Sequence, residues 1–249
     1  MQTYAIGDIH GHRDKLAAAH DLIELDRAAN GERTAPVVHM GDLVDRGPDS
    51  RGVLDFLIAG HKAGRNWVTI LGNHDRMFAG FLNDADHHDR GLRDDLQWFD
   101  PRLGGAATLA SYEVGTADRM IHEVHADAVR AVPAAHRDFI RAMPAHFLRG
   151  EALFVHAGIR PGVDLRDQAE DDLVWIRKGF LDDTRDHGVL VVHGHTALER
   201  PLHYGNRLNI DGGTGYGRPL VPVVVEGRGA WLLTPQGRVA VSYAWDIPG

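Results

Sequence analysis

Five short apolar runs of this 249-residue chain each end in side chains that can bind a metal ion. Those side chains are Asp8 and His10, Asp42, Asn73 and His74, His156, and His195. Runs of this length are typical of buried strands, and ligands of open α/β sheets bind beyond the carboxyl ends of the strands. A polar residue that closes one strand is ordinary. Five such strand ends predict one shared site at the edge of a sheet.

The arrangement of helical and extended patterns predicts an α/β fold. Apolar residues recur at helical spacing over residues 14–27, and a second helix is expected after Asp49 or Ser50, either of which can be its N-cap. Strands that alternate with helices predict βαβ units and a largely parallel sheet at the N-terminal end. From Leu208 onward, short strands without a further helix predict an antiparallel tail. No Pro/Gly/Ser linker divides residues 1–249, so one domain is expected.

Three central segments give more specific expectations. The run "NWVTILGNH" is interpreted as a strand that ends at Asn73 and His74. The acidic segment 84–101 is interpreted as an exposed loop with a helix, and residues 134–148 as a helix broken at Pro144.

The composition excludes several classes of protein. There are no cysteines, so disulfides and thiolate metal sites are excluded. The formal net charge is -8, and no cluster of Lys and Arg provides the basic face that nucleic-acid binding requires. No apolar run approaches the roughly 18 residues of a membrane span, and the N-terminus lacks the features of a signal peptide. We therefore expect a cytoplasmic protein with neither a nucleic acid nor a membrane as partner.

The candidate ligands outnumber those that one ion needs. They are Asp8, His10, Asp42, Asn73, His156 and His195. Carboxylate, imidazole and amide groups together suit Mn²⁺, Fe or Zn²⁺. Six such groups fit two ions that share a bridging carboxylate, and ion pairs roughly 3.5–4 Å apart typically hydrolyse phosphate esters.

The motifs around these residues resemble those of a known family. They are "GDIHG" at 7–11, "GDLVDRG" at 41–47, "GNHD" at 72–75, "HAGI" at 156–159 and "GHT" at 194–196. The set resembles the calcineurin-like metallophosphoesterases, and more closely the bacterial and phage serine/threonine phosphoprotein phosphatases. The motifs occur in the family's order over about three quarters of the chain. The resemblance implies a mixed β-sandwich flanked by helices, with the metal site at the carboxyl ends of the strands.

The resemblance also implies how the metal ligands are divided. Asp8 and His10 would bind a first ion together with Asp42, which would bridge to a second ion. The second ion would be completed by a set of three residues, Asn73, His156 and His195. Two divalent ions are expected, Mn²⁺ first, with Fe or Zn²⁺ as alternatives. A water or hydroxide between the ions would attack phosphorus directly, without a phosphoenzyme.

Four further residues receive roles from the same resemblance. His74 would protonate the leaving oxygen, and Asp45 would orient its imidazole. Arg46 would bind the phosphate oxygens, since a guanidinium can bind two at once. Arg177 would be a second phosphate-binding arginine, although a surface arginine after a core tryptophan is the alternative. Tyr216 lies where relatives carry a loop over the site.

The expected function is that of a metal-dependent phosphomonoesterase. It would act as a protein serine/threonine phosphatase, with phosphotyrosine as a possible further substrate. The alternative is a symmetrical bis(5′-nucleosyl)-tetraphosphate hydrolase with nearly the same metal site. Those hydrolases commonly carry alanine in place of Asp45, because a nucleotide phosphate leaves with less help from an acid. Asp45 therefore favours the phosphatase. Specificity is expected to reside in residues 84–101 and 160–172, and no prediction of oligomeric state follows from the sequence.

Overall fold

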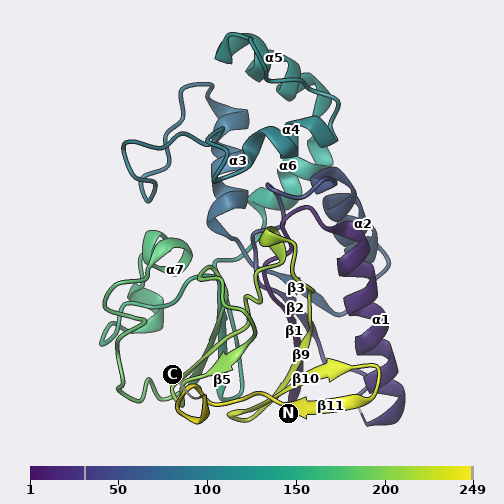
Figure 1. The fold of residues 1–249 in the computed structure, drawn as a ribbon, viewed down its shortest axis with the longest axis vertical. Helices are drawn as coiled ribbons and strands as arrows, with labels where there is room; N and C mark the ends of the chain where they lie inside the picture. The colour runs from purple at the N-terminus through teal and green to yellow at the C-terminus, as the bar shows by residue number, and fades with distance from the viewer. Residues whose placement is uncertain (31, 248–249) are drawn as a thin grey trace.

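Two β-sheets lie face to face in the computed structural model, which describes residues 1–30 and 32–247 (Figure 1). The first sheet has the order β11-β10-β9-β1-β2-β3. Its strands are β1 (Gln2–Ile6), β2 (Val37–His39), β3 (Trp67–Thr69), β9 (Val223–Glu226), β10 (Gly229–Thr234) and β11 (Gly237–Ala240). The second has the order β4-β5-β6-β8-β7. Its strands are β4 (His146–Arg149), β5 (Ala152–Val155), β6 (Leu190–His193), β7 (Leu202–His203) and β8 (Arg207–Asn209).

Helices cover the sandwich on its outer faces, as expected for this α/β fold. In Figure 1, α1 (Arg13–Ala29) and α2 (Ser50–Lys62) lie beside the first sheet, and α7 (Glu170–Trp175) lies on the opposite side. Four more helices lie together beyond one end of the sandwich. They are α3 (Asn73–Asn83), α4 (Gly105–Ser111), α5 (Ile121–Ala131) and α6 (Ala134–Arg141). The described residues contain no helix long and apolar enough to cross a membrane.

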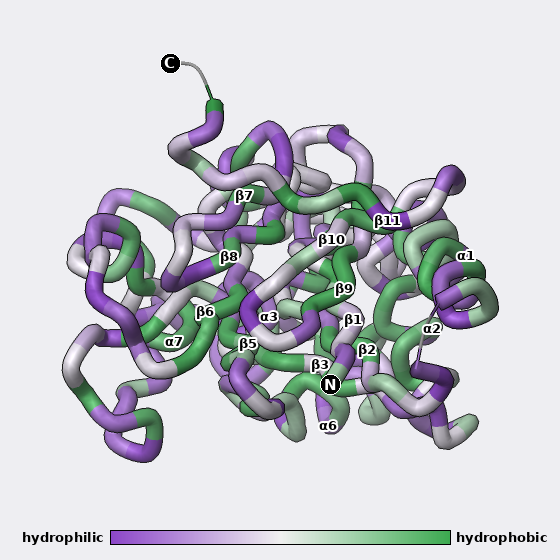
Figure 2. Tube along the Cα trace, turned by 90° about the horizontal axis from the view of Figure 1, so that it is seen from below, coloured by the Kyte–Doolittle hydropathy of each residue, from purple (hydrophilic) through white to green (hydrophobic). Residues whose placement is uncertain are grey.

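Successive side chains of a strand point to opposite faces of its sheet. The apolar residues of one strand are therefore divided between the core under the helices and the core between the two sheets. In β1, Tyr4 and Ile6 belong to the core beneath the helices, whereas Ala5 belongs to the core between the sheets. In β5, Phe154 packs in the core between the sheets and Leu153 packs on the side of α7. The apolar segments of β5, β6 and β9 accordingly lie together in the middle of Figure 2.

Strand direction confirms the predicted parallel segment and corrects the tail. β1, β2 and β3 are parallel neighbours, and β9, β10 and β11 pair antiparallel as predicted. β8 also lies in the predicted antiparallel tail, yet it pairs parallel with β6. The reason is β7, which runs antiparallel to β8, so the chain returns in the direction of β6. The parallel strands of both sheets therefore deliver their carboxyl ends to the site described below.

The structure differs most from the prediction between β3 and β4. β3 ends at Thr69, so Asn73 and His74 begin α3 instead of ending a strand. The turn forms because the buried carboxylate of Asp75 accepts the N–H groups of Gly72 and Leu43, at 3.0 and 2.9 Å. The predicted helix over 134–148 is wrong beyond Pro144, since β4 follows it and pairs with β5.

Residues 84–101 form a series of turns, so the predicted helix within them is wrong. The segment is also less exposed than predicted, because Trp98 is buried against Phe78, Phe81 and Phe99. The first part of the segment is held by Asp89, whose carboxylate accepts hydrogen bonds from Arg76 and Trp175. Long-range contacts of this kind decide the path of a segment that has no periodic pattern of its own.

Replacing Asp89 with asparagine should lower the free energy of unfolding by about 2 kcal/mol, since it removes charge-assisted hydrogen bonds from Arg76, which keeps Asp171 and Glu170 as partners. The side chains of Asp89 and Arg76 are only 2% and 14% exposed, and their nitrogen and oxygen atoms are 2.7 Å apart. Urea unfolding measures the change. A matched control is Asp95→Asn, because Asp95 pairs with Arg93 in the same segment but both side chains are well exposed. Similar changes in the two variants would contradict this prediction.

The unfolding free energy should also depend on pH through a buried histidine pair. Burial lowers the pKa of His20 to about 4 and the pKa of His39 well below its usual range. The two Nε2 atoms are 3.0 Å apart, one donating to the other. The folded rings stay neutral, whereas each unfolded histidine binds a proton near pH 6.5. The contribution of this pair to the free energy of unfolding should be constant above about pH 6.5 and fall as the pH drops toward 4, by up to about 1.4 kcal/mol per pH unit for each histidine.

Urea titrations of the metal-free protein at several pH values between 7.5 and 4.5 test this. The His20→Asn variant should have a shallower dependence on pH, because one titrating ring is lost while an amide can still bond to His39. A variant with the same slope as the unaltered chain would count against the pair as its source.

Candidate active site

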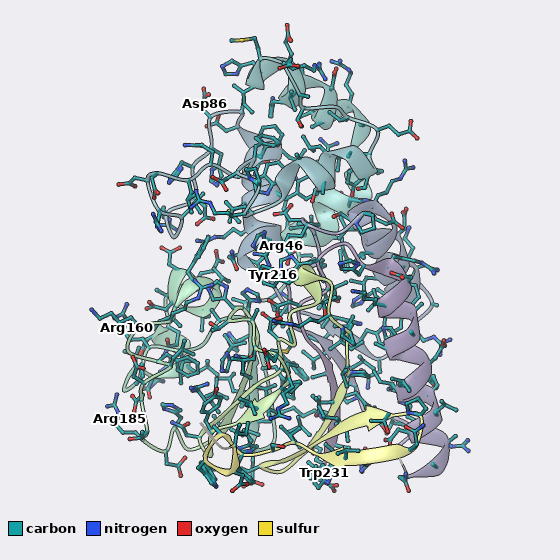
Figure 3. The ribbon with its side chains drawn as sticks, viewed as in Figure 1. Arg46, Asp86, Arg160, Arg185, Tyr216 and Trp231 are labelled. Atoms are coloured by element: carbon teal, nitrogen blue, oxygen red, sulfur yellow. The ribbon has the colours of Figure 1, made fainter. Side chains whose placement is uncertain are left out.

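The predicted site residues gather where the carboxyl ends of the parallel strands meet the first turn of α3. The candidate metal ligands and His74 are all buried, with at most 8% of any residue exposed. They are Asp8, His10, Asp42, Asn73, His74, His156 and His195. A cavity of about 250 Å³ opens beside them and is also lined by Arg46, Arg177 and Tyr216. In Figure 3, Arg46 and Tyr216 lie together between the sandwich and the group of helices beyond it.

Backbone strain is concentrated at this site. Among the described residues, seven that are not glycine have a positive φ. Five of them are site residues, namely His10 (46°), Asp42 (49°), Asp45 (72°), Arg46 (66°) and His195 (63°). Such conformations cost of order 1–3 kcal/mol each and persist where the surrounding structure enforces them. The turns that follow the strands are therefore held in unfavourable conformations that aim these side chains into one cavity.

One group of ligand atoms surrounds the amide of Asn73. Its Oδ1 lies 2.9 Å from His156 Nε2 and 2.8 Å from His195 Nδ1, and His156 Nε2 lies 3.3 Å from Asp42 Oδ1. His156 Nδ1 donates to the carbonyl of Met40 at 2.8 Å. Burial lowers the pKa of His156, so the ring is neutral and its Nε2 carries a lone pair. The lone pair of His156 Nε2 and the oxygens of Asn73 and Asp42 thus converge, an arrangement that fits a divalent cation.

A second group shares Asp42. Ligand atoms of His10, Asp42 and His74 all lie within 4.8 Å of one another. His10 Nδ1 donates to the carbonyl of Val44 at 2.9 Å, so the lone pair of the ring is on Nε2, which lies 3.6 Å from Asp42 Oδ2. Burial lowers the pKa of His10 well below its usual range, so this ring is also neutral. Asp42 is therefore the residue common to both groups.

Asp8 is close to the second group without belonging to it. In the part of the chain that the structure describes, its carboxylate is in neither group of ligand atoms. It accepts the N–H of His195 instead, at 3.0 Å to Oδ2 and 3.3 Å to Oδ1. Burial raises the pKa of Asp8 well above its usual range, and the neighbouring carboxylates of Asp211 and Asp42 act in the same direction. A cation beside these acids would favour their ionised forms.

The sequence analysis missed Asp211. It lines the same cavity, and burial raises its pKa to about 6 with a further contribution from the charge of Asp42. It follows β8 and the buried Ile210, so it also lies at the end of a strand. The residues before it, "RLNI", are not a continuous apolar run, and the short strand expected from Leu208 onward is the signal that points to it.

The charge of Asp42 is stabilised by its surroundings. Burial by itself would raise the pKa of Asp42, but His156, His74, His10 and His195 around it lower the pKa below its usual range. Its Oδ1 also accepts the backbone N–H of His74 at 3.0 Å, in the first turn of α3. The N-terminus of a helix carries partial positive charge, so α3 both orients and stabilises this carboxylate.

His74 and Asp45 form a buried pair. His74 Nδ1 donates to Asp45 Oδ2 at 2.6 Å, and Asp45 is fully buried. The same carboxylate accepts the indole N–H of Trp98 at 2.9 Å and the hydroxyl of Thr108 at 2.6 Å. The sequence predicts the pairing of His74 with Asp45 but carries no signal for the other two donors, which lie 53 and 63 residues from Asp45.

Two arginines bring positive charge to the cavity. Arg46 donates to His10 Nε2 at 2.9 Å and to His74 Nε2 at 3.2 Å, and its guanidinium carbon lies 4.9 Å from the centre of the Tyr216 ring. Arg177 donates to the carbonyl of His195 at 3.1 Å, and burial lowers its pKa. Both guanidinium groups line the cavity, so it is suited to an anion.

The sequence and the structure both match known proteins. The family model of the calcineurin-like phosphoesterases matches residues 1–212. A symmetrical bis(5′-nucleosyl)-tetraphosphatase of Nitrosococcus oceani is 41% identical over 75 residues, which are 30% of this chain and 24% of that protein. The one from Legionella pneumophila strain Lens is 39% identical over 82 residues, 33% of this chain and 27% of that protein. The chain thus matches about a quarter of the length of these curated relatives.

Solved structures match over nearly the whole chain. A protein provisionally described as a diadenosine tetraphosphatase has a TM-score of 0.60 at 19% identity, covering 96% of this chain and 93% of that one. The cold-active protein-tyrosine phosphatase of a psychrophilic Shewanella species has a TM-score of 0.61 at 17% identity, covering 96% and 80%. At these identities the likeness shows the fold.

Proposed function

Because the chain belongs to the calcineurin-like phosphoesterase family, we propose that it is a metal-dependent phosphomonoesterase that removes phosphate from phosphorylated serine, threonine or tyrosine in proteins. The observation that carries this proposal is the buried pair of His74 and Asp45, with nitrogen and oxygen 2.6 Å apart. A serine or threonine alkoxide is a poor leaving group, and an acid that protonates it contributes typically 10²–10⁴-fold to the rate.

The family uses divalent metal ions, and the donor groups of this chain fit them. We propose that Asp42, Asn73, His156 and His195 hold one ion. The other would be held by Asp8 and His10 together with Asp42, and Mn²⁺ is the first expectation, with Fe or Zn²⁺ as alternatives. When bound, such ions activate water and polarise the oxygens of a phosphoryl group.

The side chains around the cavity supply the rest of the proposed chemistry. Arg46 and Arg177 would bind the phosphoryl oxygens, and Arg46 would then leave the ring nitrogens of His10 and His74 that it contacts in this structure. Once Arg46 has moved away, His74 Nε2 would take up a proton from solvent to form the imidazolium, and it would pass that proton to the ester oxygen as the bond to phosphorus breaks. Asp45 would keep the Nδ1 proton in place and stabilise the imidazolium before the transfer.

A symmetrical dinucleoside tetraphosphate hydrolase is the second candidate. The names of the curated relatives favour it, although each match covers about a quarter of the relative. The retention of Asp45, hydrogen-bonded to His74, favours the phosphomonoesterase, because a nucleotide phosphate needs less protonation than an alkoxide.

A substrate panel tests the two candidates. The Mn²⁺-loaded protein would be supplied with a phosphoserine peptide, p-nitrophenyl phosphate and diadenosine tetraphosphate, and the release of phosphate and of ADP would be measured. We expect phosphate release from the peptide. No release from either monoester would refute the first candidate, and ADP release with a higher kcat/KM than the peptide would establish the second.

We also propose that residues 1–249 are one domain. β1 contributes side chains both to the core beneath the helices and to the core between the sheets, which supports a single cooperative unit. Limited proteolysis that released a folded fragment of the chain would contradict this.

A further inference from the structure

We propose that Trp98 and Thr108 are positioning residues that hold Asp45 so that His74 can deliver its proton to the leaving oxygen. The inference rests on the proposed function, because it concerns the same acid. Neither residue lies in the five motifs quoted above, and both come from the segment between α3 and the middle of α4.

The carboxylate of Asp45 accepts hydrogen bonds from three different side chains. Oδ2 accepts from His74 Nδ1 at 2.6 Å and from Trp98 Nε1 at 2.9 Å, whereas Oδ1 accepts from the hydroxyl of Thr108 at 2.6 Å. Donors on both oxygens prevent the carboxylate from rotating about its bond to Cβ. Oδ2 therefore stays directed at the imidazole.

Thr108 holds the backbone of Asp45 as well as its side chain. Its Oγ1 accepts the N–H of Asp45 at 2.8 Å, and Ser50 accepts the same N–H at 3.2 Å. Asp45 has a φ of 72°, an uncommon conformation for a residue with a side chain. The Thr108 hydroxyl therefore holds both the main chain and the carboxylate of Asp45, which keeps this strained residue in place.

The segment that carries these donors packs closely on the motif that it supports. A Cβ added to Gly105 would lie 2.5 Å from the Trp98 ring, and one added to Gly104 would lie 2.5 Å from the backbone nitrogen of Arg46. The carbonyl of Gly104 accepts the N–H of Arg46 at 3.3 Å. Only glycine at these two positions lets the segment pack this closely on Arg46 and Trp98. The close packing brings Trp98 and Thr108 within hydrogen-bond distance of Asp45, although they are distant from it in the sequence.

The consequence for the reaction depends on the leaving group. If one donor is removed, the carboxylate can rotate and the imidazole loses its fixed direction. His74 Nε2 must lie within roughly 2.6–3.2 Å of the oxygen that accepts its proton. A small misplacement of the ring can lower the rate by up to about 10²-fold. An alkoxide needs this proton to leave, whereas a nitrophenolate leaves with little protonation. A substitution that acts through His74 should therefore slow a phosphoserine peptide far more than p-nitrophenyl phosphate.

Trp98→Phe and Thr108→Val test the inference in the Mn²⁺-loaded protein. Each variant removes the donor to Asp45 while preserving most of the side-chain volume. We expect kcat for the phosphoserine peptide to fall by about 10- to 100-fold and kcat for p-nitrophenyl phosphate to change little. KM for both substrates and the metal content per chain should be unchanged. The Thr108→Ser variant keeps the hydroxyl and should recover most of the peptide activity.

Two control variants distinguish a loss of Asp45 positioning from a general loss of protein stability. Trp231→Phe alters a tryptophan of β10 at the far end of the molecule from Arg46 (Figure 3). Ser111→Ala removes a hydroxyl of the same helix as Thr108, one that donates to the carbonyl of Thr108 and not to Asp45. Both controls should keep the ratio of the two activities.

The outcomes distinguish this inference from the function on which it rests. If His74→Asn is selective for the peptide but Trp98→Phe and Thr108→Val slow both substrates equally, the positioning roles are wrong and the acid role stands. If His74→Asn itself slows both substrates equally, the acid role is wrong. If circular dichroism shows that Trp98→Phe does not fold, the comparison of Thr108→Val with Thr108→Ser tests the positioning role. Equal impairment of those two variants overturns the inference.

Discussion

The Asp42→Asn variant should lose about 10²- to 10³-fold in kcat and should retain fewer than two metal ions per chain. Asp42 is the one residue common to both groups of ligand atoms, and its two carboxylate oxygens face different groups. Asparagine offers a single neutral oxygen in the same volume, so it removes both a ligand atom and the negative charge. Elemental analysis after dialysis, together with turnover of p-nitrophenyl phosphate, measures the two effects.

A matched control for this variant lies seven residues away. Asp49 is the N-cap of α2 and accepts the N–H of Gly52 at 2.8 Å. Asparagine caps helices as well as aspartate does, so Asp49→Asn removes the same charge just beyond the motif without touching the site. Its metal content and turnover should match those of the unaltered chain. Two ions per chain in Asp42→Asn would refute the bridging role.

The His74→Asn variant should lose about 10²- to 10⁴-fold in kcat on a phosphoserine peptide and far less on p-nitrophenyl phosphate. The imidazole is the group that would protonate an alkoxide, whereas a nitrophenolate needs little help to leave. Asparagine can still donate a hydrogen bond to Asp45, so the buried carboxylate keeps a partner. Steady-state kinetics on both substrates at saturating Mn²⁺ measure the ratio.

The control for this substitution is His122→Asn, since His122 is an exposed residue of α5. It should leave both rates unchanged. Equal losses on the two substrates in His74→Asn, with normal metal content, would mean that His74 does not act as the acid. Its Nε2 also belongs to the group of ligand atoms around Asp42, so metal content must be measured in the same samples.

The sequence predicts the N-terminal part of the fold well because its signals there are local. The helical spacing of apolar residues locates α1, and Asp49 locates the start of α2 through its bond to Gly52. The parallel order of β1, β2 and β3 follows from the helices that connect them. Each of these features depends on residues that are near one another in the chain.

Prediction fails where contacts between distant residues decide the structure. The path of residues 84–101 depends on the ion pair of Asp89 with Arg76 and on the burial of Trp98. The turn from β3 into α3 depends on Asp75 and on the N–H of Leu43, which is 32 residues earlier. β8 joins β6 as a parallel neighbour because β7 reverses the chain.

The sequence by itself determined the kinds of side chain that end the strands and their order along the chain, because an apolar run and its terminal residue are read from adjacent positions. The tertiary structure alone decided which atoms converge. It placed Asn73 Oδ1 between two histidines, directed Asp8 to the backbone of His195, and brought Trp98 and Thr108 to Asp45. Such contacts depend on distances of 2.6–3.3 Å between atoms up to 187 residues apart, and only the packing of the two sheets and the helices sets those distances.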